Sequence, residues 1–220
     1  MHHELRRFDD PTALAKGAAA YVADRIRDGQ ARGATFTFAL SGGKSPWAMF
    51  EDLAHDDVDW AATRIYQVDE RVVSESSDLR NLKSLREALQ GTNAPIDAMD
   101  VEADDLEEAC REYAALLPER LGLVHLGIGP DGHCASLIPG DPVLEITDRL
   151  VALSGPYQDA LRMTLTYPAL ARADQLLWLI SGEDKREALA KLLAGDPSIP
   201  AGRVVAKASL VMADRAALGE

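Results

Sequence analysis

Residues 35–46 read TFTFALSGGKSP. The first six are aromatic, β-branched or apolar, and they predict a short buried strand. The glycines that follow predict a tight turn, and Pro46 suits the first turn of a helix. A strand, a glycine turn and a helix form the repeating unit of an α/β sheet, in which ligands bind outside the carboxyl ends of the strands. This stretch therefore predicts both the fold class and the edge of the sheet where function is located.

The same alternation of strands and helices continues on both sides of this unit. An amphipathic helix is expected from Pro11, after the capping pair Asp9-Asp10, to its end at Gly33. The alternation is typical of an α/β, Rossmann-like fold, a mostly parallel sheet with helices on both faces. Residues 139–156 interrupt it with proline, glycine and aspartate, and predict a small extra subdomain within one domain spanning residues 1–220. The other expected strands cover residues 64–68, 123–128, 150–153, 162–166, 175–180 and 204–205, and the other expected helices cover 81–89, 104–121 and 184–193.

Composition and charge narrow the class of partner. The chain has 23 Lys and Arg against 36 Asp and Glu, and this net charge of −13 counts against broad electrostatic binding to nucleic acid or to an anionic membrane surface. Its apolar runs, such as residues 176–180, are far shorter than the roughly 20 residues needed to cross a bilayer. Charges within residues 1–10 stand where a signal peptide requires an apolar core. Cys110 and Cys134 lack metal or redox spacing, so we expect reduced thiols and a cytoplasmic protein.

The loop SGGKS at residues 41–45 has the composition of an anion site. Its glycines allow backbone N–H groups to approach a phosphate at the start of a helix, where the helix dipole favours negative charge. It is not a Walker loop, because that motif requires glycine where this chain has Phe38. A tight turn without a ligand is the alternative interpretation. A weaker one is a nucleophile elbow with Ser41 as nucleophile and His133 as base, and the chain lacks the glycine-rich oxyanion segment of such enzymes.

Residues 127–132, GIGPDG, match the pattern G-x-G-x-x-G that follows a strand in dinucleotide-binding folds. Pro130 and the residues after it leave no room for the long helix that holds a pyrophosphate, so we reject that interpretation. What remains is Asp131 and His133, two residues apart at the end of a strand. A carboxylate can orient an imidazole and stabilise its charged form, as general-base catalysis requires. The alternative is a capped loop in which His133 only bonds to the backbone.

Other polar residues also follow expected strands. Asp69, Glu70 and Arg71 end the strand over 64–68, where they can bind sugar hydroxyls or phosphate, or form an ion-pair network. Lys185 lies near the start of a helix after a strand, where an ammonium group can reach a bound anion. Arg80, Asn81 and Arg162 carry no signal when each is taken alone. His125 lies in the middle of a strand and is expected to be structural.

Taken in order, these segments resemble the 6-phosphogluconolactonase family within the wider glucosamine-6-phosphate isomerase and lactonase superfamily. The resemblance covers almost the whole chain, and the block GPDGHxASL at residues 129–137 is its most specific part. The other segments that carry the resemblance are LSGGKSP at 40–46, VDER at 68–71, RNL at 80–82, RMTLT at 162–166 and SGEDK at 181–185.

This resemblance implies hydrolysis of 6-phospho-D-glucono-1,5-lactone to 6-phosphogluconate in the oxidative pentose phosphate pathway. It implies no metal or cofactor, a phosphosugar lactone as the ligand, and a monomer or homodimer. His133 would be the general base and Asp131 would orient it. The residues that the resemblance places around the substrate and its phosphate are Ser41, Gly42, Gly43, Lys44, Asp69, Arg71, Arg80, Asn81, Arg162 and Lys185.

Two rival functions share the same pocket. The deaminases of the superfamily carry a glutamate shortly after the histidine, whereas residues 135–140 here contain no acid, which favours hydrolysis. A non-catalytic sugar-phosphate sensor is the second rival, and the retained His133 argues against it. Lys44, Cys134 and Ile138 depart from the residues common in the family, and none of them removes a proposed catalytic group.

Overall fold

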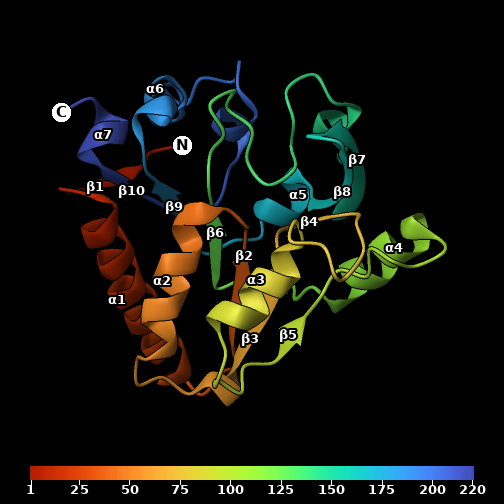
Figure 1. Ribbon diagram of the computed structural model, residues 1–220, viewed down its shortest axis with the longest axis horizontal. Coiled ribbons are helices and arrows are strands. Elements are labelled where there is room, and N and C mark those ends of the chain that lie inside the picture. Colours follow the sequence, from red (N-terminus) through yellow and green to blue (C-terminus); the bar gives the residue numbers. More distant parts are fainter.

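A seven-stranded parallel sheet lies at the centre of the structure, in the order β1-β10-β9-β6-β2-β3-β5 (Figure 1). The computed structural model describes residues 1–220, apart from the side chains of Lys44 and Ser45. The strands of this sheet are β1 (Glu4–Phe8), β2 (Phe36–Leu40), β3 (Thr63–Gln67), β5 (Ile96–Asp97), β6 (Leu123–Leu126), β9 (Leu176–Ile180) and β10 (Ser209–Asp214). The α-helices are α1 (Pro11–Gln30), α2 (Lys44–Ala54), α3 (Asn81–Ala88), α4 (Leu106–Leu116), α5 (Tyr167–Leu170), α6 (Arg186–Ala194) and α7 (Arg215–Leu218).

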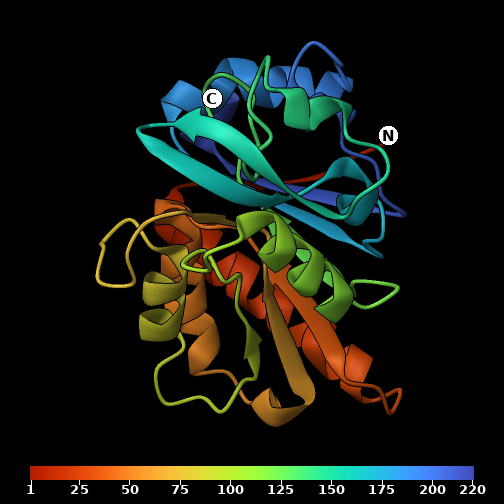
Figure 2. The same ribbon diagram turned by 90° about the vertical axis from the view of Figure 1, so that its right-hand side faces the viewer.

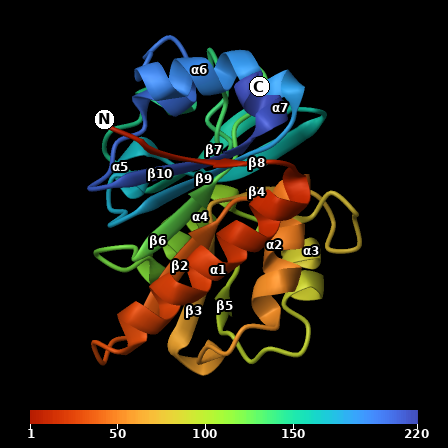
Figure 3. The same ribbon diagram turned by 90° about the vertical axis from the view of Figure 1, so that its left-hand side faces the viewer.

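Both faces of this sheet are buried, because successive side chains of a strand point to opposite faces. In β2, Phe38 and Leu40 pack with α1 and α2 on one face, while Ala39 packs on the other. Figure 3 shows α1 and α2 lying across that first face. The opposite face is covered by α4, α5, α6 and a second sheet. Strands buried on both faces read as continuous apolar runs, and all five residues of β9 are buried.

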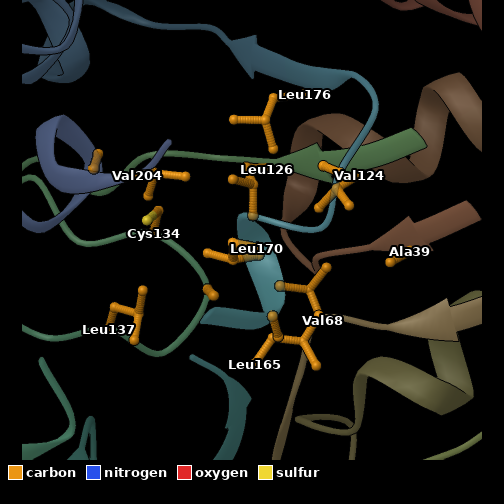
Figure 4. Packing of buried hydrophobic residues seen from close by; sticks show 14 of the residues in the cluster. Ala39, Val68, Val124, Leu126, Cys134, Leu137, Leu165, Leu170, Leu176 and Val204 are labelled. Carbon is orange, nitrogen blue, oxygen red and sulfur yellow. The ribbon is translucent and has the colours of Figure 1, made fainter. Parts of the chain in front are cut away.

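The second sheet has three antiparallel strands in the order β4 (Asp69–Arg71), β8 (Ala160–Leu165) and β7 (Val151–Tyr157). Figure 2 shows the long hairpin of β7 and β8 curving over the molecule. Val68 joins the two sheets through its backbone, since its N–H donates to Leu40 of β2 and its carbonyl accepts from Leu165 of β8. Apolar side chains from both sheets meet at this junction, as Figure 4 shows for Val68, Leu165 and Leu126.

The α/β class, the mostly parallel sheet and the helices on both faces are confirmed. The strand expected at residues 204–205 was wrong, because the last strand is β10, whose fully buried run SLVMAD shows no alternation to mark it. The edge strand β1 was not expected either, since its sequence ELRRF is largely exposed. Helix α4 ends at Leu116 rather than near 121, because Pro118 disfavours helical geometry at Leu117.

The extra subdomain takes a different form from the one expected at residues 139–156. That range supplies a short 3₁₀ turn, Pro142–Glu145, and most of β7. β7 pairs with β8, which in turn pairs with β4, and both of these strands lie outside the range. The strands expected at 150–153 and 162–166 therefore exist, and they belong to this antiparallel sheet. None of the described helices has both the length and the apolar character needed to span a membrane.

Candidate active site

The chain reverses direction across the sheet between β2 and β6. From β2 it proceeds outward to β3 and β5, and it then returns to β6 on the other side of β2. Ligand sites of open α/β sheets lie at such a switch point, outside the carboxyl ends of the strands. A pocket of about 550 Å³ occurs there. Its walls are the loops that follow β2, β6 and β9, together with residues of the second sheet.

The loop after β6 carries the acid and the imidazole. Asp131 Oδ1 lies 2.6 Å from His133 Nδ1 and accepts from the backbone N–H of His133 at 3.1 Å. The loop folds back tightly, because the Gly129 N–H donates to the His133 carbonyl and the Gly132 N–H donates to the Gly129 carbonyl. Gly132 has a φ of +84°, a conformation that favours glycine. A side chain at Gly129 would overlap the imidazole, so this glycine allows His133 its position.

The charge on Asp131 determines which ring nitrogen of His133 is free. Partial burial acts to raise the pKa of Asp131, but the hydrogen bonds and positive charge of His133 outweigh it, and the pKa falls below its ordinary value. An ionised carboxylate only accepts hydrogen bonds, so Nδ1 carries the proton in the neutral ring. The Nε2 lone pair is then available as a base. His133 lines the pocket, and Asp131 supports it from outside the lining.

Asp69 forms hydrogen bonds with residues of three other motifs. Its carboxylate accepts from the Ser41 hydroxyl at 3.1 Å and from the Ser136 hydroxyl at 2.7 Å, and its backbone carbonyl accepts from the Asn81 amide at 3.0 Å. A side chain at Gly42 would overlap Asn81. The glycine loop, the VDER segment and the loop after β6 are therefore held in one arrangement. Because Ser41 donates to Asp69 rather than to His133, this geometry does not support the nucleophile elbow.

Glu70 and Arg80 form a buried pair behind the pocket. Glu70 accepts from the backbone N–H groups of Asn81 and Leu82 at 2.8 Å each, and so caps the start of α3. The guanidinium of Arg80 lies 3.5 Å from Glu70 and donates to the carbonyl of Val73. Arg80 is not among the described residues that line the pocket, whereas Asn81 is. The structure therefore places Arg80 in the support of the site.

Three described cations line the pocket: Arg71 of β4, Arg162 of β8 and Lys185 after β9. Burial, followed by the charge of Arg71, lowers the pKa of Arg162. The Nε atoms of Arg71 and Arg162 have no hydrogen-bond partner among the described groups. Lys185 lies 3.0 Å from Asp184, which also lines the pocket. The pocket is thus suited to an anionic ligand. Lys44, predicted to belong to this site, has a side chain outside the described part of the structure, and its role stays a prediction.

The residues predicted at the sheet edge come together here. The pocket is lined by Ser41, Gly42, Gly43, Asp69, Arg71, Asn81, His133, Arg162 and Lys185. The sequence reasoning missed Tyr157, whose hydroxyl lies 3.3 Å from Asp131, because only the pairing of β7 with β8 brings it to the site. It also missed Ser136, although that residue lies inside the most specific motif. The described side chains contain no group of three or more His, Cys, Asp or Glu arranged to hold a metal ion.

Comparisons with known proteins agree with this arrangement. A family model described as glucosamine-6-phosphate isomerases/6-phosphogluconolactonase matches residues 9–212. A 6-phosphogluconolactonase of Streptomyces coelicolor is 32% identical over 218 residues, which cover 87% of this chain and 83% of that protein. The crystal structure of a 6-phosphogluconolactonase from Shewanella baltica has a TM-score of 0.87 and 26% identity, covering 97% of this chain and 98% of the other. A monomeric glucosamine-6-phosphate deaminase has a TM-score of 0.86 at 20% identity, covering 98% and 99%. The fold is therefore common to proteins with both activities.

Proposed function

The chain belongs to the family of glucosamine-6-phosphate isomerases and 6-phosphogluconolactonases, and we propose that it hydrolyses 6-phospho-D-glucono-1,5-lactone to 6-phosphogluconate. The observation that carries this proposal is the pair Asp131 and His133 facing a pocket with three cations. A lactone is an ester, so its hydrolysis needs a base for water and positive charge for the developing oxyanion. The reaction is the second step of the oxidative pentose phosphate pathway.

His133 Nε2 takes a proton from the attacking water as the oxygen adds to the lactone carbonyl. Asp131 keeps its hydrogen bond to Nδ1 and stabilises the imidazolium that forms. The tetrahedral intermediate then collapses, the bond between the carbonyl carbon and the ring oxygen breaks, and the imidazolium returns its proton to that oxygen. A positioned general base contributes typically about 10²–10⁴-fold to the rate.

The phosphate is anchored away from the reacting carbon. The loop from Ser41 to Gly43 leads into helix α2. The N–H groups and the helix dipole at the start of a helix favour an anion. Lys185 approaches from the end of β9, and Arg162 from the second sheet. Anchoring a remote group places the carbonyl within reach of the activated water. Arg71, directly opposite Arg162 in the second sheet, adds positive charge to the same part of the pocket.

Isomerisation with deamination is the second candidate within the family, and the pocket favours hydrolysis over it. The deaminases of the superfamily carry a glutamate shortly after the histidine, an additional group for proton transfer that this site would have to supply. Among the described residues that line the pocket, the carboxylates are Asp69 and Asp184. Asp69 is engaged by two serine hydroxyls and Asp184 by Lys185. Ala135 occupies the pocket wall after His133, where no carboxylate is available.

The proposed setting is the cytoplasm, with the chain acting as a monomer or homodimer on a small phosphosugar lactone. Both cysteines are free and buried in the structure, and free thiols are typical of a reducing compartment. The negative net charge of the chain directs anion binding to the local cationic pocket rather than to the surface as a whole.

The test generates the lactone in situ and follows its consumption above the spontaneous rate. The wild-type chain should accelerate hydrolysis, and His133→Ala should lose about 10²-fold or more of that acceleration while it still binds 6-phosphogluconate. The matched control is His55→Ala, since His55 is exposed at the end of α2 and its loss should leave turnover unchanged. No acceleration by the folded wild type would contradict the proposal. Release of ammonia from glucosamine 6-phosphate would then support the deaminase.

A further inference from the structure

Tyr157 ends β7 at the two-residue turn that leads into β8, and no motif of the sequence pointed to it. The turn residues Gln158 and Asp159 both have positive φ, at 53° and 62°. Tyr157 pairs with Ala160 across this turn. The hairpin carries the tyrosine from the second sheet to the loop that follows β6, where it lines the pocket. Its position therefore depends on both sheets.

The tyrosine contacts both members of the proposed base pair. Its hydroxyl donates to Asp131 Oδ2 at 3.3 Å, while Oδ1 of the same carboxylate bonds to His133. Its ring lies edge-to-face against the imidazole, with centroids 5.0 Å apart and planes at 62°. The hydrogen bond restrains the plane of the Asp131 carboxylate, and the ring contact restrains the tilt of the His133 imidazole.

Tyr157 is itself held by Arg162. The guanidinium lies 5.4 Å from the centroid of the tyrosine ring, and Nη2 donates to the Tyr157 carbonyl at 2.8 Å. Arg162 is almost fully buried, and its Nε has no partner among the described groups. The arginine thus fixes the tyrosine and at the same time faces the anion pocket.

We propose that Tyr157 is a positioning residue for the base: its hydroxyl fixes the second oxygen of Asp131 and its ring fixes the imidazole of His133. The expected change in kcat rests on the proposed function, whereas the contacts of Tyr157 with Asp131 and His133 do not depend on that function. A half-exposed aspartate with one oxygen engaged keeps rotational freedom, and a hydrogen bond to the other oxygen removes that freedom. Burial and the charge of Asp131 raise the pKa of Tyr157, so the hydroxyl keeps its proton at neutral pH and can donate it.

The chain offers a matched control in Tyr167. Its hydroxyl donates to the Pro200 carbonyl at 3.0 Å, and the Arg203 guanidinium lies 5.0 Å from its ring centroid. The two tyrosines therefore have the same kinds of contact, but Tyr167 is not among the described residues that line the pocket. Tyr157→Phe and Tyr167→Phe each remove one hydroxyl hydrogen bond, so a purely structural role predicts similar behaviour for both.

The experiment measures kcat and KM against pH for Tyr157→Phe, Tyr157→Leu and Tyr167→Phe. For Tyr157→Phe we expect kcat to fall about two- to tenfold, the range set by the net contribution of one hydrogen bond, with little change in KM. The acidic limb of its profile should move to higher pH, because the carboxylate of Asp131 then keeps more of its charge for the imidazolium of His133. Tyr157→Leu should lose a further factor of about two to ten as the ring contact disappears. Tyr167→Phe should keep the wild-type kcat and profile.

A second measurement separates this inference from the proposed function. Nitrogen NMR of the His133 ring should report protonation at Nδ1 in the wild-type chain. In Tyr157→Phe the Nδ1 proton signal of His133 should broaden, because the carboxylate of Asp131 is no longer held in one plane, whether or not the protein hydrolyses the lactone. A wild-type kcat and an unchanged Nδ1 signal of His133 in Tyr157→Phe would overturn the inference, and would show that Tyr157 only anchors the hairpin.

Discussion

Arg71 of β4 and Arg162 of β8 stand directly opposite each other in the antiparallel ladder of the second sheet. Like charges in directly opposed positions destabilise a sheet, and the charge of Arg71 contributes to the lowered pKa of Arg162. Both side chains line the pocket. An anion bound between the two guanidinium groups reduces this repulsion. The repulsion in the ligand-free sheet therefore favours the binding of anionic ligands.

Arg162→Gln is expected to weaken binding of 6-phosphogluconate about ten- to a hundredfold, since a hydrogen bond to a charged group contributes about 1.5–3 kcal/mol. The free energy of unfolding without ligand should change by less than about 1 kcal/mol. The hydrogen bond lost at the Tyr157 carbonyl is offset by relief of the repulsion from Arg71. Titration calorimetry and thermal unfolding measure the two effects. Arg172→Gln, which removes one bond to the Pro118 carbonyl, is the control. Unchanged affinity in Arg162→Gln would remove Arg162 from the anion site.

Gly129→Ala should inactivate the site without unfolding the chain. The added methyl group would overlap the imidazole of His133 and crowd the carboxylate of Asp131, so the ring must leave its position. We expect kcat to fall by about 10² or more, as for loss of a general base, while circular dichroism stays native. Gly127→Ala is the control for backbone stiffening, because no described atom beyond the adjacent residues lies within 4 Å of the added methyl, and it should keep the NMR signal of a correctly oriented His133. Near-normal kcat in Gly129→Ala would show that the ring position is not critical.

His125 makes stability depend on pH. It is fully buried in β6, and burial, opposed by a smaller effect of the Ser41 backbone, lowers its pKa to about 4. The unfolded chain takes up this proton near pH 6.5. Stability is therefore fully present above pH 6.5 and falls by about 1.4 kcal/mol per pH unit between 6.5 and 4, roughly 3 kcal/mol in all.

The test of this pH dependence compares His125→Leu with the wild type by urea unfolding from pH 7 to pH 4.5. The leucine variant should match or exceed the wild-type stability at pH 7, because an apolar side chain replaces a buried polar ring, and its advantage should grow as the pH falls. Equal slopes for the two proteins would show that His125 does not titrate in this range.

Asp159→Gly is expected to raise the thermal midpoint by about 2–4 °C. Asp159 has a φ of +62° in the hairpin turn, which costs a residue with a side chain on the order of 1 kcal/mol relative to glycine. Asp159 does not line the pocket, so kcat should stay unchanged. A lower midpoint would mean that contacts of the Asp159 side chain outweigh the backbone strain.

Local signals in the sequence were sufficient for several parts of the structure. Asp10 caps α1 through the Ala13 N–H, one residue before Pro11, as the capping pair and the proline predicted. The bond between Asp131 and His133 joins residues two apart in one turn, so proximity was evident before any fold was known. Where the local signal was weak, in the exposed β1 and the uniformly buried β10, the strands were missed.

Sequence patterns alone predicted the class of fold, the segments that follow strands, and the neighbouring acid and imidazole that we propose as the catalytic pair. These depend on side-chain periodicity, caps and turns, which act over a few residues. Three contacts are visible only in the folded chain: Asp69 bonds to Ser136, 67 positions away, Arg71 faces Arg162, and Tyr157 reaches Asp131. Each of these contacts depends on how strands distant in the chain pair and in which register. That choice is made by burial of the two sheets against each other, and no short stretch of residues encodes it.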